Sequence, residues 1–285
     1  MSAMEKGLIW IELEDGLRRP GCPICGILAE GTRRNFSFFL NDGVLDPGMR
    51  LRLVESGGWC GRHTLLLLNV ESREYADHMG YATVLESLLE IAEGRLAEAL
   101  RGLRRRQASA ASRSRRRTIQ RACDALRPHK ACPACESEEK REASYLGFFI
   151  DALFNPALAP EMKALYAGSE GLCYRHLIGC LERCASPDQA NELAGLEKQK
   201  LTALSKEVSE YLRKHEHRYR EEPFGDEIDA WARAARKLAG YQPAGLDLQE
   251  LADAARRKET RARERSKGAL HTASPGEREG NDRPL

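Results

Sequence analysis

The feature that most constrains this chain is a set of cysteine and histidine pairs that occurs twice. Cys22-Pro23-Ile24-Cys25 is followed by Cys60-Gly61-Arg62-His63, and Cys132-Pro133-Ala134-Cys135 is followed by Cys173-Tyr174-Arg175-His176. A Cys-x-x-Cys pair places two thiolates about one tetrahedral edge apart, and Cys-x-x-His at a helix start places sulfur and imidazole on one face. Each half of the chain is therefore expected to supply one complete metal site with four ligands.

The expected ligand sets are Cys22, Cys25, Cys60 and His63 for the first half, and Cys132, Cys135, Cys173 and His176 for the second. Three thiolates and one imidazole suit zinc in a closed, structural centre, so two zinc ions are expected. An iron–sulfur cluster is the alternative, because soft thiolates serve both and spacing does not distinguish them. A thioredoxin-like dithiol is disfavoured, because that motif follows a strand whereas here a helical pattern ends at Pro20.

The resemblance between the halves extends beyond these ligands. A shift of 110 positions pairs Phe38 and Phe39 with Phe148 and Phe149, and a shift of 113 pairs Met49 with Met162. Matches in the same order indicate an internal duplication, with residues 20–107 and 130–219 as two copies of one module. The predicted organisation is a first module with its leading helix over 1–107, an arginine-rich connection over 108–129, a second module with a final helix over 130–240, and a largely disordered tail over 241–285.

Apolar spacing predicts helices throughout, so the expected fold class is all-α. Ile9, Leu13 and Leu17 recur every four residues before Pro20, and stripes of leucine predict long packing helices over 72–106 and 187–219. A short helix is expected between Pro47 and the glycines at 57 and 58. The long helices are expected to pack together or to form a protein or homodimer interface.

Charge is nearly balanced overall but unevenly distributed. The formal net charge is +2, yet residues 101–127 hold ten arginines against Asp124. This basic segment is predicted to be a flexible connection and a candidate contact for nucleic-acid phosphate. The chain shows no apolar run of about 18 residues for a membrane span, and Met1 to Arg19 lacks a signal-peptide core, so a cytoplasmic protein is expected.

A further motif follows the second module. The pattern Cys-Pro-x-Cys, an aromatic helix and Ser-x-Gly-x-Cys-x-x-His occurs twice, and Tyr219-Arg220-Glu221-Glu222-Pro223-Phe224-Gly225-Asp226-Glu227 comes after it. In these residues the chain resembles a family of prokaryotic proteins catalogued as a domain of unknown function, over about residues 5–240. The resemblance implies a metal-binding or redox role for the eight ligand candidates and brings no activity with it.

Two functional classes fit these observations. The first is a metal-stabilised interaction or nucleic-acid-associated protein, and the second is an iron–sulfur or thiol-based protein for redox chemistry or metal handling. The sequence holds no phosphate loop, catalytic triad, paired catalytic carboxylates or three-ligand open site, so an enzyme is the less favoured interpretation. The remaining cysteines, Cys123, Cys180 and Cys184, and the histidines His215 and His217 are not expected to be ligands.

Overall fold

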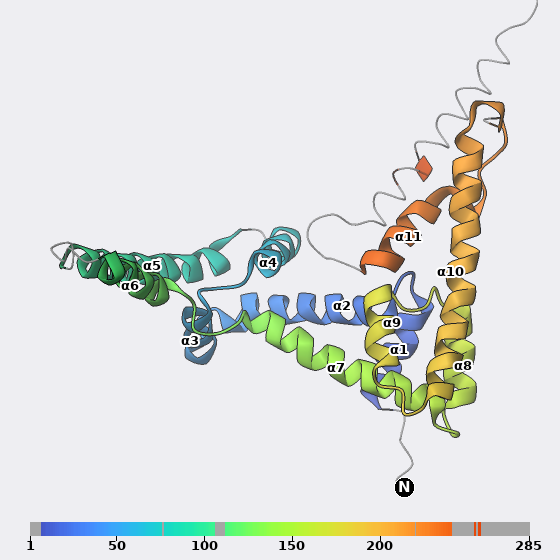
Figure 1. Ribbon diagram of the computed structural model, residues 1–285, viewed down its shortest axis with the longest axis horizontal. Coiled ribbons are helices and arrows are strands. Elements are labelled where there is room, and N and C mark those ends of the chain that lie inside the picture. The colour runs from blue at the N-terminus through green and yellow to red at the C-terminus, as the bar shows by residue number, and fades with distance from the viewer. Residues whose placement is uncertain are drawn as a thin grey trace, which may run out of the picture. The chain divides into compact units, whose positions relative to one another are not determined.

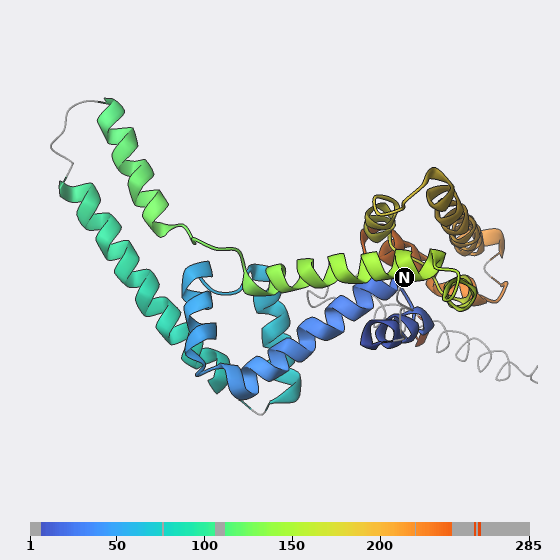
Figure 2. The same ribbon diagram turned by 90° about the horizontal axis from the view of Figure 1, so that it is seen from below.

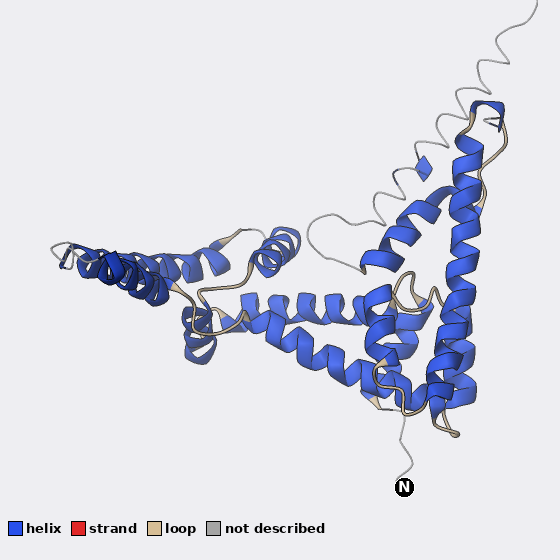
Figure 3. Ribbon diagram, in the orientation of Figure 1, coloured by secondary structure: helices blue, strands red, loops and turns tan. Residues whose placement is uncertain are grey.

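The protein is all-α, as the sequence predicted. A computed structural model describes residues 7–75, 77–105, 112–219, 221–240, 254, 256 and 257, and within these residues it contains helices and no strand (Figure 3). None of the helices in the described part of the chain combines the length and the apolar character that crossing a bilayer requires. The tail predicted to be disordered, 241–285, lies outside the described residues except for three positions.

Two series of helices follow one another along the chain (Figure 1). The first consists of α1 (Leu8–Arg18), α2 (Pro23–Phe38), the π-helical turn η1 (Phe39–Gly43), α3 (Pro47–Ser56), α4 (Gly61–Glu74) and α5 (Met79–Arg105). The second consists of α6 (Ser112–Leu126), α7 (Pro133–Phe154), α8 (Ala159–Gly168), α9 (Tyr174–Leu181) and α10 (Pro187–His215). Two 3₁₀ turns, η2 (His217–Tyr219) and η3 (Asp226–Asp229), then lead to α11 (Ala230–Ala239).

The helix order confirms the internal duplication. Helices α2, α3, α4 and α5 correspond in order to α7, α8, α9 and α10. In both copies the first cysteine is the N-cap of its helix and a proline follows it, and Cys60 and Cys173 are N-caps with nearly the same extended backbone. Proline favours the first helical position because its fixed φ suits the helix and no N–H is lost. We call residues 20–107 repeat 1 and 130–219 repeat 2.

The chain forms two compact units, each described by itself. The described residues up to Leu201, together with 236–240, form the first unit, and the described residues of 202–235 with 254, 256 and 257 form the second. Within the first unit α2 and α7 lie side by side (Figure 2, blue and yellow-green). Their contacts show that they run antiparallel. The start of α2 and the later turns of α7 both contact α1, and the end of α2 reaches Trp59 beside α4.

Both hydrophobic cores of the first unit draw on both repeats. The larger core combines α1 and the start of α2 with α7, α8 and α9, and includes Trp10, Ile24, Phe149 and Tyr166. The smaller combines the end of α2 with η1, α3, α4 and α5, and takes Ala134 from α7. Neither repeat therefore completes a core from its own residues alone.

The long helix predicted over 72–106 is interrupted. The structure ends α4 at Glu74 and starts α5 at Met79, where the Asp77 carboxylate accepts a hydrogen bond from the Met79 amide at 3.0 Å. The buried Glu71 side chain also accepts from the amide of Tyr81 at 2.9 Å. These side-chain acceptors satisfy amides at the new helix start, which a leucine stripe alone does not reveal.

Residues 108–111 of the predicted flexible connection lie outside the described residues, and the arginine-rich residues that follow them are helical. Residues 112–126 form α6, which packs along α5 as an antiparallel hairpin (Figure 2). The amphipathic pattern that includes Thr118 and Ala122 escaped the sequence analysis because arginines dominate the composition. The principal partner of α5 is therefore α6.

Candidate metal centre

The eight predicted ligands gather into two groups of four, but each group combines both repeats. Site 1 consists of Cys22, Cys25, Cys173 and His176, and site 2 consists of Cys60, His63, Cys132 and Cys135. The expectation that each repeat supplies a complete site is wrong. In each site the Cys-x-x-Cys pair of one repeat meets the Cys-x-x-His pair of the other. This follows from the antiparallel arrangement of α2 and α7. Helix α2 begins at site 1, to which repeat 2 adds its Cys-x-x-His pair, and α7 begins at site 2, to which repeat 1 adds its own.

The donor atoms in each site have the spacing of a single coordination sphere. In site 1 the Nδ1 atom of His176 lies 3.3 Å from the sulfur atoms of Cys22, Cys25 and Cys173, and two of these sulfurs are 3.7 Å apart. In site 2 the Nδ1 atom of His63 lies 3.3 to 3.4 Å from its three sulfurs, and the Cys60 and Cys135 sulfurs are 3.7 Å apart. Zinc–sulfur bonds of about 2.3 Å imply a sulfur–sulfur edge of about 3.8 Å. Both sites therefore fit a four-coordinate metal ion.

A glycine with positive φ turns the backbone before the Cys-x-x-His pair of each site. Gly58 and Gly171 each stand two residues before the cysteine and have φ values of 96° and 79°. Residues with a Cβ rarely adopt this left-handed region. The chain then becomes extended at Cys60 or Cys173 and enters the helix at the next residue, so the histidine falls in the first turn. The positive end of the helix dipole favours thiolate at these positions.

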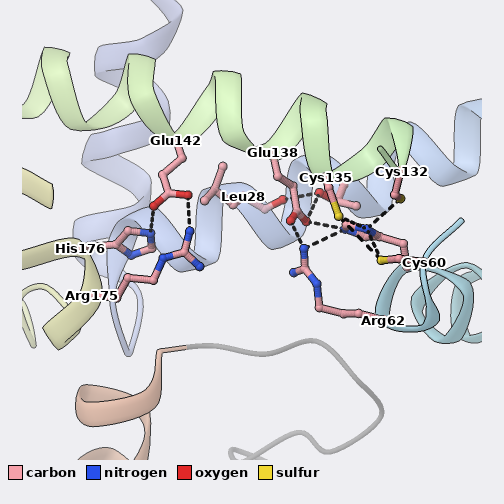
Figure 4. A network of polar contacts seen from close by, with 11 residues as sticks. Leu28, Cys60, Arg62, Cys132, Cys135, Glu138, Glu142, Arg175 and His176 are labelled. Carbon is pink, nitrogen blue, oxygen red and sulfur yellow. Dashed lines mark hydrogen bonds and ion pairs between the residues drawn. The ribbon is translucent and has the colours of Figure 1, made fainter. Parts of the chain in front are cut away.

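Each histidine faces the cysteine sulfurs with Nδ1 and a glutamate carboxylate with Nε2, and both glutamates belong to α7 (Figure 4). The Nε2 atom of His63 lies 3.1 Å from Oε1 of Glu138, and the Nε2 atom of His176 lies 3.3 Å from Oε1 of Glu142. When Nδ1 binds a metal, Nε2 carries the proton, and a carboxylate at this position fixes the ring and increases its basicity.

The arginine before each histidine contacts the same carboxylate. Arg62 donates to Glu138, and Arg175 Nη2 donates to Glu142 Oε2 at 2.6 Å. Thr32 of α2 also donates to Glu138, at 2.8 Å. The arginines therefore orient the carboxylates that lie beside the histidines.

In site 2 the pKa values of the ligand side chains shift in different directions. Burial would raise the pKa of Cys132, but hydrogen bonds from His63 and from backbone amides outweigh it and bring that pKa to about 6. Burial and the negative charge of Cys132 raise the pKa of Cys135 to about 12. The pKa of His63 rises to about 9, because its bonds to Cys132 and Glu138 outweigh burial. These shifts favour an imidazolium of His63 paired with a thiolate of Cys132.

Site 1 also combines one thiol of lowered pKa with a histidine of raised pKa, but the thiol is that of Cys173 in the Cys-x-x-His pair. Hydrogen bonds from Cys22 and Cys25 lower the pKa of Cys173 far below its ordinary value, whereas burial raises the pKa of Cys22. The pKa of His176 rises to about 10, because hydrogen bonds with the Cys173 and Cys25 sulfurs outweigh burial. The two sites therefore have the same ligand types, but the pKa values of the equivalent cysteines Cys22 and Cys132 shift in opposite directions.

Gly240 and the buried ion pair of Lys237 with Glu197 lie beside site 1. A Cβ at Gly240, whose φ is 77°, would lie 3.3 Å from the Cys173 sulfur and 3.5 Å from the Cys25 sulfur. Lys237 donates to the buried Glu197 at 2.6 Å and to the Glu170 carbonyl at 2.9 Å. Glu197 also accepts from the Leu172 amide at 2.8 Å, next to Cys173. This network holds the loop that carries Cys173 in place.

Sequence reasoning missed the acidic residues around both sites. Cys135, Glu138 and Glu142 are spaced by three and four positions, so they share one face of a helix. That spacing was a usable signal, but it is hard to recognise in a segment with acidic residues at 136, 138, 139 and 142.

Among the described residues Cys123, Cys180 and Cys184 lie outside both groups, and His215 packs against Tyr211 and Phe224.

Comparisons with known proteins place the chain in a family. The family model described as "Family of unknown function (DUF6062)" matches residues 4–245, so the chain belongs to that family. A curated relative, an uncharacterized 23.9 kDa protein in the xynA 3' region of Caldicellulosiruptor sp. (strain Rt8B.4), is 24% identical over 230 residues, covering 80% of this chain and 99% of the relative. No solved structure matches the chain.

Proposed function

We propose that this family member binds two zinc ions, each held by three cysteines and one histidine, which fasten repeat 1 to repeat 2. The observation that supports it is the compactness of each site, where all four donor atoms lie within 4.8 Å of one another. That spacing suits one metal ion, whereas an iron–sulfur cluster binds cysteines on different irons and separates their sulfurs further. Because protein atoms fill four positions, no coordination position remains for a substrate, and a structural role follows.

Metal analysis of the purified chain tests this proposal. We expect about two zinc ions per chain, and cobalt substitution should give the absorption of tetrahedral cobalt with sulfur ligands. Cys60→Ser and Cys173→Ser should each remove about one ion, while Cys123→Ser, an exposed cysteine outside both sites, should remove none. A brown protein with iron and labile sulfide would instead support the redox or metal-handling function.

The interaction role that we propose alongside zinc binding is contact with nucleic-acid phosphate. The hairpin of α5 and α6 is the supporting feature, because Arg116, Arg117 and Arg121 are exposed on α6. Aromatic residues are absent from 101–127, which favours contact with the phosphate backbone over base stacking.

Salt dependence of binding tests the phosphate contact. Replacing Arg116, Arg117 and Arg121 by Gln should weaken binding to duplex DNA or RNA and reduce the slope of log affinity against log salt by about three. Replacing Arg18 and Arg19 by Gln provides the control. Absence of salt-dependent binding by the unmodified chain at low ionic strength would reject this role.

The same hairpin is our proposed surface for a second copy of the chain. Leu89, Leu96 and Leu100 of α5 are 69%, 49% and 44% exposed. Apolar residues at helical spacing are typical of a helix–helix interface. Leu89→Glu should shift the sedimentation coefficient toward the monomer, and an unmodified chain that is monomeric at all concentrations would reject the interface.

A further inference from the structure

A pocket of about 230 Å³ lies beside the outer contacts of both candidate metal sites. Three ligands of site 1 border it, and Leu28 of α2 contributes to its apolar lining. The rest of its polar lining consists of two glutamate–arginine pairs, Glu138 with Arg62 and Glu142 with Arg175. The first pair contacts the histidine of site 2 and the second contacts that of site 1, so one pocket adjoins the supports of both histidines.

The internal duplication brings two equivalent arginines to this pocket. Arg62 and Arg175 occupy the same position in the two repeats, one residue before the histidine ligand. Figure 4 shows both side chains on the same side of α7, where their guanidinium groups point toward each other from opposite directions. Two cations that face each other repel, so an anion between them would be stabilising.

The arginines, unlike the glutamates, have hydrogen-bonding capacity to spare. Glu138 and Glu142 each lie within hydrogen-bonding distance of both an arginine and a histidine, and both carboxylate side chains are mostly buried. The Arg175 side chain is 72% exposed, and within the described residues it donates to Glu142 through Nη2 alone. Arg62 also donates to its glutamate through Nη2, and its side chain is 35% exposed. A guanidinium carries five N–H donors, so Arg175 retains donors for a further acceptor.

We propose that this pocket binds a phosphate group, either as inorganic phosphate or as the monoester of a small molecule. The terminal oxygens of a phosphate surround one centre, so different oxygens can accept from the two guanidinium groups at once, whereas a carboxylate pairs fully with one. A phosphate monoester carries a charge of about −1.5 to −2 at neutral pH, which matches two arginines. The pocket is smaller than most ligand sites, which favours a phosphate with little or no organic group attached.

Phosphorus-31 NMR titration of the full chain tests the proposal, and metal analysis of the same samples reports on zinc binding separately. Inorganic phosphate and phenyl phosphate should bind saturably, with Kd of about 1 mM for the tighter of the two. Tighter binding of inorganic phosphate would identify the free ion as the ligand, and tighter binding of phenyl phosphate would identify a small-molecule ester. Dimethyl phosphate, which carries one charge, should bind at least about tenfold more weakly. Absence of saturable binding of both phosphates at about 10 mM would overturn the proposal.

Variants distinguish this pocket from general attraction of phosphate to arginine. Arg175→Gln should weaken phosphate binding about tenfold, because one of two charge-assisted contacts is lost, and Arg175→Lys, which keeps the charge, should weaken it about threefold. Arg34→Gln is the matched control, because Arg34 also pairs with a glutamate, Glu12, at 2.8 Å, but lies outside the pocket. Binding by Arg175→Gln as tight as that of the unmodified chain, or an equal loss in Arg34→Gln, would overturn the proposal.

Discussion

Glu138 and Glu142 lie one helical turn apart on α7, and each faces the histidine of a different site. The duplication does not predict this arrangement, because the positions that match them in α2 are Leu28 and Thr32. Figure 4 shows both carboxylates on the same side of α7, with Leu28 nearby. One helix therefore supports both candidate metal sites, although the ligands come from both repeats.

Glu138→Gln should weaken zinc binding at site 2 about 10- to 100-fold and leave site 1 unchanged, because the amide holds the histidine less well than a carboxylate. Glu142→Gln should have the converse effect. Competition with a chromophoric chelator measures both affinities. Glu139→Gln, an exposed neighbour on α7, is the matched control, and equal loss at both sites in either variant would contradict the assignment.

Cleavage between the repeats should leave them associated while metal is bound. A protease site inserted within residues 106–111 would separate repeat 1 from repeat 2 covalently, but each site joins ligands of both. We expect the two fragments to elute together in size-exclusion chromatography and to separate more readily after chelation, because structural zinc contributes to folding stability directly. Chromatography of the uncut chain under chelation is the control. Fragments that separate with both metals still bound would contradict the exchanged ligand sets.

Gly240→Ala should destabilise the protein by about 1–2 kcal/mol, because a left-handed φ disfavours alanine and the new methyl would crowd the Cys173 sulfur. Gly195→Ala is the matched control. No atom lies within 4 Å of its added Cβ, so alanine inside α10 should stabilise by about 0.5–1 kcal/mol. Denaturant unfolding monitored by circular dichroism gives both values, and a neutral Gly240→Ala variant would show that Gly240 does not pack tightly against site 1.

Zinc binding at site 2 should weaken as pH falls. Near neutral pH the metal-free site keeps protons on His63, with a pKa of about 9, and on Cys135, with a pKa of about 12. The metal must displace both, so log affinity should rise by at least about two per pH unit between about pH 6.5 and 8. Calorimetry in buffers of different ionisation enthalpy counts the released protons, and release of fewer than two would contradict these protonation states.

The sequence predicted the parts of each site that depend on neighbouring residues. The Cys-Pro-x-Cys turns and the glycines before Cys60 and Cys173 follow from local backbone preferences, and the structure places helices where these signals predict them. The assignment of pairs to sites depends on how α2 and α7 pack. Spacing along the chain does not determine that packing, because either pairing gives the same ligand types.

The exchange of ligands between repeats sets an order of events during synthesis. Cys60 and Cys135 are 75 positions apart, whereas Cys22 and His176 are 154 positions apart. A growing chain therefore has every ligand of site 2 while α9 is still to be made. At about 5–20 residues per second, His176 follows Cys135 by about 2–8 s. During that interval the thiols of Cys22 and Cys25, the first to be synthesised, have no histidine partner, so candidate site 2 has its full ligand set before candidate site 1 does.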